Sequence, residues 1–309
     1  MDSFYNKSKA ASLVNELASE RKSQYPEGFY LSELNLGAQW QRRLDFIQRL
    51  DPVEWRLVCN DEEDAATEVL FVVHGAVSSR DLALMNSKVN SKKALFLRQG
   101  LSLTGYGAES FARAVEAIPK VFALFSQDIG EHNLAEMDCV GSYQGYQSMS
   151  ASNRYFTQRE MAQDLSELLI TKDMDPHRYL ANIAGDKYVY MDDNHIGFYE
   201  CKTTASGERE FIEVSPNKIQ IGDIVELHMS FTAVPLKGGR KKVVSVLRSV
   251  TLLDGNLTEE AVAVKSNIRI QASSLKRKNI HEGEIMSETG RKFSHMRIRE
   301  PEPTETPST

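Results

Sequence analysis

Six extended segments follow one another between Lys187 and Ala272, and this succession limits the folds open to the chain. They are rich in Val, Ile, Tyr, Phe and Thr, and short Gly, Asp and Asn turns separate them. The predicted strands are 187–191, 195–203, 208–214, 223–236, 241–253 and 267–272. Consecutive strands of this kind pair as an antiparallel meander, and a meander closes most easily as a barrel. Residues 181–275 are therefore predicted to form a small β-barrel-like unit.

The part before this region has a different pattern. Apolar residues at helical spacing predict helices over 8–22, from Trp40 to Leu50 and over 108–127, with a break demanded by Pro119. Residues 55–60, 68–74 and 94–103 are predicted strands. We interpret residues 1–180 as a mixed, mainly helical unit.

Two segments near the predicted boundary are expected to differ in structure, one being a loop and the other a helix. Val140 to Tyr155 is polar, contains Gly and Ser and has no period, which predicts a loop. Thr157 with Glu160 three residues later resembles a capping box, so a helix is expected from Thr157 to about Asp173. The fold class predicted for the whole chain is α+β.

The C-terminal segment 276–309 contains Pro301, Pro303 and Pro307 among Glu and Thr residues. Such a composition cannot bury a core, so a flexible tail is expected. Three widely spaced cysteines favour a reducing compartment. No signal-peptide pattern or membrane-spanning apolar run is recognisable, which predicts an intracellular protein, either nuclear or cytoplasmic.

The charge is unevenly distributed along the chain. The whole sequence carries a net charge of −6, yet residues 216–278 hold 11 basic and 5 acidic residues. A basic region in an acidic chain indicates contact with a polyanion. The sequence contains no complete catalytic motif, so whether the protein is an enzyme is left open.

The first functional hypothesis is a binding face for single-stranded nucleic acid on an OB-like barrel. Stacking rings beside phosphate-seeking cations are what such binding requires. The candidate residues are Tyr188, Tyr190, Phe198, Lys237, Arg240, Lys241, Lys242, Arg248 and Arg269. The alternative interpretation is that the rings fill the barrel interior and the cations form a solvated hairpin tip. No cofactor is implied by this hypothesis.

Two other functions remain open. A sheet edge or the helical unit could dock another protein or a second copy of the chain, giving a homo-oligomer. The segment from Asp193 to Glu200 and Lys202 also resembles the PD-(D/E)xK nuclease signature. In that family two carboxylates, here Asp193 and Glu200, would hold Mg²⁺, and the lysine would activate water. The proline of that signature is missing from this chain.

A last resemblance concerns the segment GDIVELHMSFTAVPLKGGRKKVVSVLRSVTLLD, residues Gly222 to Asp254. It resembles a recurring stretch in uncharacterised proteins of basidiomycete fungi. The resemblance covers about a tenth of the chain and implies a fungal intracellular protein, without implying an activity.

Overall fold

The computed structural model describes residues 3–35, 37, 43–60, 66–82, 91–162, 166–172, 174–204 and 207–273. Residues Met1–Ala263 form one compact unit, and a second unit covers Val264–Thr309. The predicted tail, 276–309, lies outside the described residues. In the part of the chain that the structure describes, no helix is long and apolar enough to cross a membrane.

Strands make up most of the regular structure. They are β1 (Phe29–Tyr30), β2 (Leu44–Leu50), β3 (Val53–Asn60), β4 (Ala66–Glu68), β5 (Phe71–Asp81), β6 (Arg98–Thr104), β7 (Leu134–Ala135), β8 (Val140–Tyr143), β9 (Tyr146–Arg154), β10 (Thr157–Gln158), β11 (Tyr188–Val189), β12 (Gly197–Thr203), β13 (Arg209–Glu213), β14 (Ile224–Pro235) and β15 (Lys241–Asp254). The helices are α1 (Lys7–Gln24), α3 (Glu109–Glu116), α4 (Ile118–Ile129), α5 (Tyr179–Ala184) and α6 (Asn256–Ser273). Short 3₁₀ turns include η1 (Leu31–Glu33), η4 (Arg159–Met161) and η5 (Asp192–Asn194).

Thirteen strands form one sheet, whose main path runs β13-β12-β15-β14-β5-β6-β9-β8. Most ladders are antiparallel, and β12 pairs with β15 in parallel. The sheet is curled, as one hydrogen bond shows. Ser245 Oγ on β15 donates to the carbonyl of Ser150 on β9 at 2.7 Å, although β15 and β9 are not neighbours in the path. The path itself is open, ending at β13 and β8. The fold is therefore a mixed α+β fold dominated by a curled sheet.

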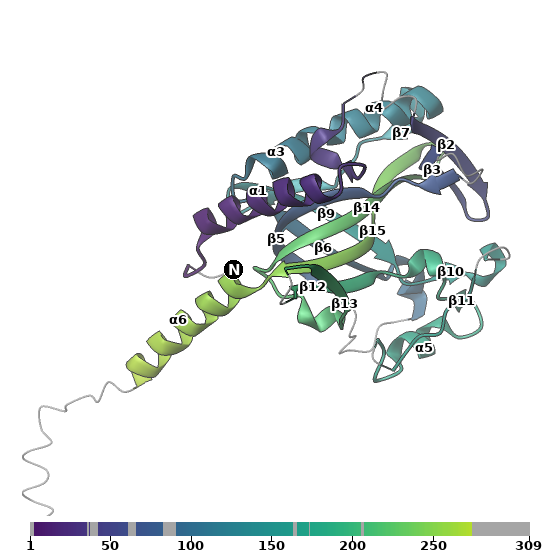
Figure 1. The fold of residues 1–309 in the computed structure, drawn as a ribbon. Helices are drawn as coiled ribbons and strands as arrows, with labels where there is room; N and C mark the ends of the chain where they lie inside the picture. Colours follow the sequence, from purple (N-terminus) through teal and green to yellow (C-terminus); the bar gives the residue numbers. More distant parts are fainter. Residues whose placement is uncertain are drawn as a thin grey trace, which may run out of the picture. The chain divides into compact units, whose positions relative to one another are not determined.

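The main core lies between this sheet and the helices. Helices α1, α3 and α4 lie along one side of the sheet, and α5 with β10 and β11 lies on the other (Figure 1). Phe71, Phe231 and Phe125 are fully buried in the main core. A second, smaller cluster around Phe156 and Leu180 supports α5 and the β10–β11 pair. Strands from before and after residue 180 thus share one sheet, and the predicted boundary at that residue does not divide it.

Several local predictions are confirmed. Helix α1 matches the expected 8–22 segment, and the predicted break near Pro119 appears at Ala117, between α3 and α4. Proline is tolerated in the first turn of α4 because its missing N–H would have no partner there. The long strands β14 and β15 match the predicted 223–236 and 241–253 segments, joined by a turn with Gly238 and Gly239 at positive φ.

The predicted helix from Trp40 to Leu50 is wrong over its described part. Residues Leu44–Leu50 form β2, which pairs antiparallel with β3. Phe46 packs against Phe125 of α4, with ring centroids 4.9 Å apart. The apolar residues in this segment fit a period of two as well as a helical one, and pairing with β3 decided between the two.

Two further segments differ from expectation. Val140 to Tyr155 is a β-hairpin, β8–β9, whose turn has Gln144 and Gly145 at positive φ. Its second strand, β9, pairs antiparallel with β6 from Ser148 to Arg154. The helix expected from Thr157 is replaced by β10 and η4, since the Thr157 hydroxyl contacts Asn194 Oδ1 at 3.2 Å instead of capping a helix.

The last predicted strand, 267–272, is also wrong, because these residues belong to helix α6. The helix continues from Asn256 without interruption, so the short β-branched stretch around Ile268 and Ile270 follows the helical conformation set before it.

Candidate nucleic-acid interface

Arg248 occupies an irregular point of the β14–β15 ladder. His228 faces Ser249 and Met229 faces Leu247, so Arg248 is the extra residue of a bulge. A bulge redirects a side chain that regular alternation would place elsewhere. The Arg248 guanidinium donates to the backbone carbonyl of Asp193 at 2.8 Å and contacts Glu68 Oε1 at 2.6 Å.

The turn η5 is held across the curled sheet by side chains from several strands. Asn153 of β9 donates through Nδ2 to the Asp193 carbonyl at 2.8 Å, and Gln99 of β6 donates through Nε2 to the Asn194 carbonyl at 3.0 Å. Both side chains are buried. Because these amides position the backbone, the Asp193 carboxylate points into a fixed environment.

That environment consists of arginines. Arg49 Nη1 lies 2.7 Å from Asp193 Oδ2, Arg56 Nη2 donates to the same oxygen, and Arg248 Nη1 lies 3.5 Å from Oδ1. Burial alone would raise the pKa of Asp193, but the hydrogen bond and charge of Arg56, with the charges of Arg248 and Arg49, hold it well below its usual 3.8. Asp193 is therefore a buried, ionised counterion.

Two more arginines stand beside this network. Arg98 of β6 and Arg154 of β9 are directly opposite each other in the ladder. Among the described residues neither guanidinium has a hydrogen bond or ion-pair partner. Arg98 is exposed and Arg154 is half-buried, and the surrounding protein lowers the pKa of both by desolvation. The charges of Glu54 and Asp193 raise the pKa of Arg154, and the smaller effects of Arg56 and Arg98 lower it.

We call this set the arginine cluster: Arg49, Arg56, Arg98, Arg154 and Arg248. The acidic groups within it are Glu54, Glu68 and Asp193, so five cations face three anions. Each acid already contacts at least two of Arg49, Arg56 and Arg248. A small crevice of about 50 Å³ lies between Arg154, Arg98 and Arg248 and includes the buried, unpaired hydroxyl of Thr232. The cluster thus has an excess of positive charge and an unsatisfied polar group.

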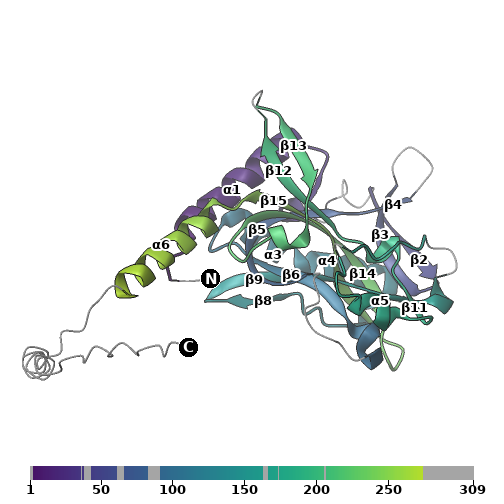
Figure 2. The ribbon, with the colours of Figure 1, turned by 90° about the horizontal axis from the view of Figure 1, so that it is seen from below.

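A groove adjoins the cluster at Arg248. Its volume is about 390 Å³, and its lining includes Tyr199 of β12, Phe211 of β13 and Arg21 of α1. The β12–β13 hairpin lies beside α1 (Figure 2), and Arg209 pairs with Glu20 there at 2.5 Å. Arg248 lines both this groove and the crevice, so the two lie on either side of its side chain.

The aromatic rings of the groove are placed by close packing. A Cβ atom at Gly197 would lie 2.7 Å from the Tyr199 ring, so the ring lies against the strand only because residue 197 is glycine. Phe211 is 44% exposed, and the Arg21 guanidinium lies 5.4 Å from its ring centroid. The groove therefore presents aromatic surface beside two arginines, of which Arg21 is paired with Glu226 and Arg248 with Glu68.

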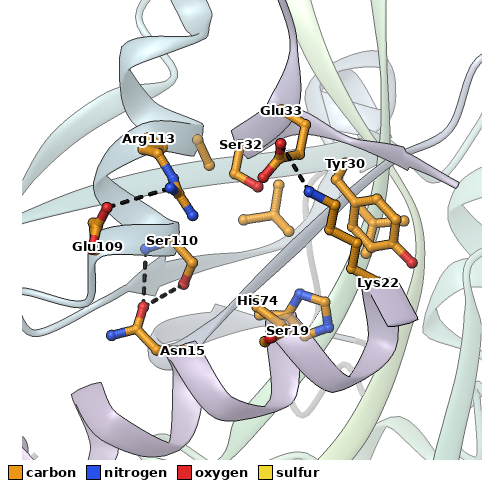
Figure 3. A pocket seen from close by; sticks show the side chains of 14 residues that line it. Asn15, Ser19, Lys22, Tyr30, Ser32, Glu33, His74, Glu109, Ser110 and Arg113 are labelled. Carbon is orange, nitrogen blue, oxygen red and sulfur yellow. Dashed lines mark hydrogen bonds and ion pairs between the residues drawn. The ribbon is translucent and has the colours of Figure 1, made fainter. Parts of the chain in front are cut away.

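A second, separate cavity lies between α1, α3, η1 and β5 (Figure 3), with a volume of about 330 Å³. Lys22 pairs with Glu33 at 3.0 Å, and Arg113 pairs with Glu109 at 3.3 Å. Asn15 Oδ1 accepts from the backbone N–H and hydroxyl of Ser110. Because each cation in its wall has an acidic partner, this cavity has no charge excess, unlike the arginine cluster.

The candidate rings are dispersed in the structure. Tyr188 packs on Phe156 in the second core, with ring centroids 6.3 Å apart. Tyr190 and Phe198 are buried, and the Tyr190 hydroxyl lies 3.1 Å from His195 Nδ1. Phe198 belongs to the main core and Tyr188 packs on the second core, so the candidate rings do not form one surface.

The candidate cations differ in their surroundings. Arg248 belongs to the arginine cluster, and Lys237 and Arg240 are exposed in the β14–β15 turn. Lys242 pairs with Asp138 at 2.6 Å, and Lys241 Nζ lies 4.2 Å from the Trp55 ring centroid. The side chain of Arg269 lies outside the described residues.

The residues of the nuclease hypothesis do not meet around one site. Glu200 lies 3.4 Å from both Lys202 and Lys218, whereas Asp193 is enclosed by arginines. In the described ranges, no group of three His, Cys, Asp or Glu side chains is placed to hold a metal ion. The arginine cluster around Asp193 is suited to binding an anion.

Sequence reasoning missed Arg49, Arg56, Arg98 and Arg154 as well as Tyr199 and Phe211. Arg49 and Arg56 lie on the consecutive strands β2 and β3, but Arg98 and Arg154 come from β6 and β9, which are distant from these and from each other in the chain. Tyr199 and Phe211 lie within predicted strands, but only the register of β12 with β13 and β15 shows which face they share.

Neither a family model nor a curated protein matches the chain. Solved structures similar to it include a C-terminal truncation of the single-stranded DNA-binding protein from bacteriophage Enc34, with a TM-score of 0.33 and 10% identity, covering 60% of this chain and 86% of that chain. The same phage protein in complex with single-stranded DNA has a TM-score of 0.32, 10% identity and the same coverage. A single-stranded DNA-binding protein encoded by bacteriophage T7 has a TM-score of 0.31 and 10% identity, covering 68% of this chain and 98% of that chain.

Proposed function

We propose that this protein binds single-stranded nucleic acid along the arginine cluster and the adjoining groove. One observation carries the proposal. Arg98 and Arg154 have no described acidic partner, while all three acids of the cluster are already shared by Arg49, Arg56 and Arg248. Cations in excess of the nearby acids create a positive potential that attracts an anion from outside the chain, and this anion would complete the cluster.

Phosphate is the anion that suits this geometry. Guanidinium groups present planar, paired N–H donors that match phosphate oxygens, and Arg98 and Arg154 stand directly opposite each other on paired strands. Several cations along one surface favour a polyanion over a single phosphate, because each neutralised phosphate releases bound counterions.

The groove supplies the second component, base stacking. Tyr199 and the exposed Phe211 lie next to Arg21 and Arg248, and a base could stack on these rings only if it were unpaired. In this proposal the curled sheet provides the binding face that was expected from the sequence on an OB-like barrel. Binding is electrostatic capture followed by stacking, with no covalent step.

The decisive experiment is fluorescence anisotropy of a labelled oligonucleotide across a salt series. The variant with Arg98→Ala and Arg154→Ala should bind more weakly at all sequences. The slope of log affinity against log salt concentration should be smaller in magnitude by about 1.4. Each lost phosphate contact reduces this slope by about 0.7 for single strands, and two contacts are lost. Arg113→Ala is the matched control, since Arg113 is exposed, pairs with exposed Glu109 and lies outside the cluster. Unchanged affinity in the double variant would refute the proposed interface.

After protein docking, the sequence offers a Mg²⁺-dependent nuclease as a further alternative. It requires Asp193 and Glu200 to share one ion, yet Asp193 contacts three guanidinium groups and Glu200 contacts two lysines. The observed contacts therefore favour binding over cleavage. Incubating the protein and oligonucleotide with Mg²⁺ or Mn²⁺ tests it, since shortened products that disappear in Glu200→Ala would support the nuclease.

A further inference from the structure

A largely apolar cavity of about 620 Å³ lies beside the groove. Leu168, Leu169 and Met174 line one part, and Tyr190, Ile196 and Phe198 line another. Leu169 is 88% exposed, which is unusual for a leucine next to an apolar cavity. A volume of this size accommodates a small ligand or a flat aromatic group.

The cavity and the groove meet at the beginning of β12. Successive side chains of a strand point to opposite faces, so Tyr199 lines the groove while Phe198 lines the cavity. His195, which precedes the strand, lines both. A base in the cavity and a strand in the groove would therefore both contact His195.

The mouth of the cavity has polar groups with defined roles. The Tyr190 hydroxyl lies 3.1 Å from His195 Nδ1, and burial followed by the charge of Asp192 raises the pKa of Tyr190 to about 12. The phenol is therefore protonated at neutral pH, and its O–H can donate a hydrogen bond to Nδ1. This tautomer leaves the Nε2–H of His195 as a donor, and the carboxylate of Glu213 on β13 supplies an acceptor.

We propose that this cavity receives one nucleobase of the bound strand, stacked against Tyr190 and Phe198 and hydrogen-bonded at its edge by His195 and Glu213. The proposal rests on the proposed function. A nucleobase fits better than an alkyl chain, because it combines flat apolar faces with donors and acceptors at its edge. His195 lines both spaces, so it links the base in the cavity to the strand in the groove.

The test is photo-crosslinking of a labelled oligonucleotide that carries one 5-iodouridine, with the attached residues identified by peptide mass spectrometry. We expect crosslinks at Tyr190, His195 or Phe198. Thr171→Trp, which fills the cavity from its rim, should lower the crosslink yield and weaken binding by about five- to hundredfold, the effect of losing one stacked base. The salt dependence of binding should not change, because no charge is altered.

Thr203→Trp is the matched control, since Thr203 is exposed on the same strand as Phe198 and lies outside the cavity. If Thr171→Trp fails to fold, Leu169→Ala replaces it. Leu169 is almost fully exposed, so its removal should reduce crosslinking without loss of stability.

The outcomes separate the two proposals. Salt-sensitive binding with crosslinks only at Tyr199 or Phe211 would overturn the base cavity and leave the interface intact. Absence of salt-sensitive binding would overturn both. Free 5-iodouridine at the oligonucleotide's concentration should not label the cavity, and equal labelling by the free nucleoside would refute delivery by the strand.

Discussion

Nε2 of His74 lies 3.1 Å from Oε2 of Glu226, and Nε2 of His228 lies 2.9 Å from the other oxygen of the same carboxylate. Arg21 of α1 donates to Oε2 at 2.9 Å. This buried carboxylate thus joins α1, β5 and β14 at the floor of the groove. It also gives the buried His74 a hydrogen-bond partner.

Glu226 should make the protein sensitive to acid. Burial alone would raise its pKa, but hydrogen bonds from His228 and His74 outweigh burial and hold the pKa far below 4.5. A carboxylate with a lowered folded-state pKa stabilises the fold above its unfolded value and loses that contribution as pH falls. We expect the free energy of unfolding, from urea titrations, to decrease as pH falls below about 4.5. Glu226→Gln should flatten this decrease, and the exposed Glu210→Gln should retain it; a wild-type profile in Glu226→Gln would contradict the assignment.

Asp193 should be essential for stability, because it neutralises three guanidinium groups. Asp193→Asn leaves Arg49, Arg56 and Arg248 without their shared counterion, and breaking such a buried network costs about 3–5 kcal/mol. Urea denaturation at pH 7 measures the loss. Asp192→Asn, at the exposed neighbouring position, should be close to wild type. Equal stabilities for both variants would show that the arginine contacts contribute little.

The groove rings should affect affinity without affecting salt dependence. Tyr199→Ala and Phe211→Ala should each weaken oligonucleotide binding by about 1–3 kcal/mol, the usual effect of losing a stacking platform. Because neither ring carries charge, the salt slope should match wild type, in contrast to the Arg98 and Arg154 variants. Phe96→Ala is the control, since Phe96 is 79% exposed and does not line the groove. Full affinity in both groove variants would remove stacking from the mechanism.

The β14–β15 turn should contribute through charge alone. Lys237 and Arg240 are exposed, and no ion pair involving either is present in the described part of the chain. Lys237→Ala with Arg240→Ala should weaken binding to all sequences alike and reduce the salt slope, with unchanged melting temperature. Anisotropy and thermal melts distinguish this result from unfolding. An unaltered salt slope would place the turn outside the interface.

The elements predicted correctly from sequence carry strong local signals. Helix α1 buries Ala10 and Val14, which are one helical turn apart. Pro119 marks the break between α3 and α4, and Gly238 with Gly239 marks the turn between two long β-rich runs. The errors fall where local signals are ambiguous. Residues 44–50 fit both periods, and the Thr157 hydroxyl found a partner, Asn194, 37 residues away.

The sequence by itself determined the mixed α+β class, the strand-rich second half and its excess of basic residues, because periodicity, turn residues and charge are local properties of the chain. Only the tertiary structure decided where positive charge is left unpaired. Arg49, Arg56, Arg98, Arg154 and Arg248 come together because their strands pair in one curled sheet, and a bulge at Arg248 redirects its side chain. Which of these cations has a counterion depends on contacts between residues up to 180 positions apart, as between Arg248 and Glu68, and no local pattern encodes such contacts.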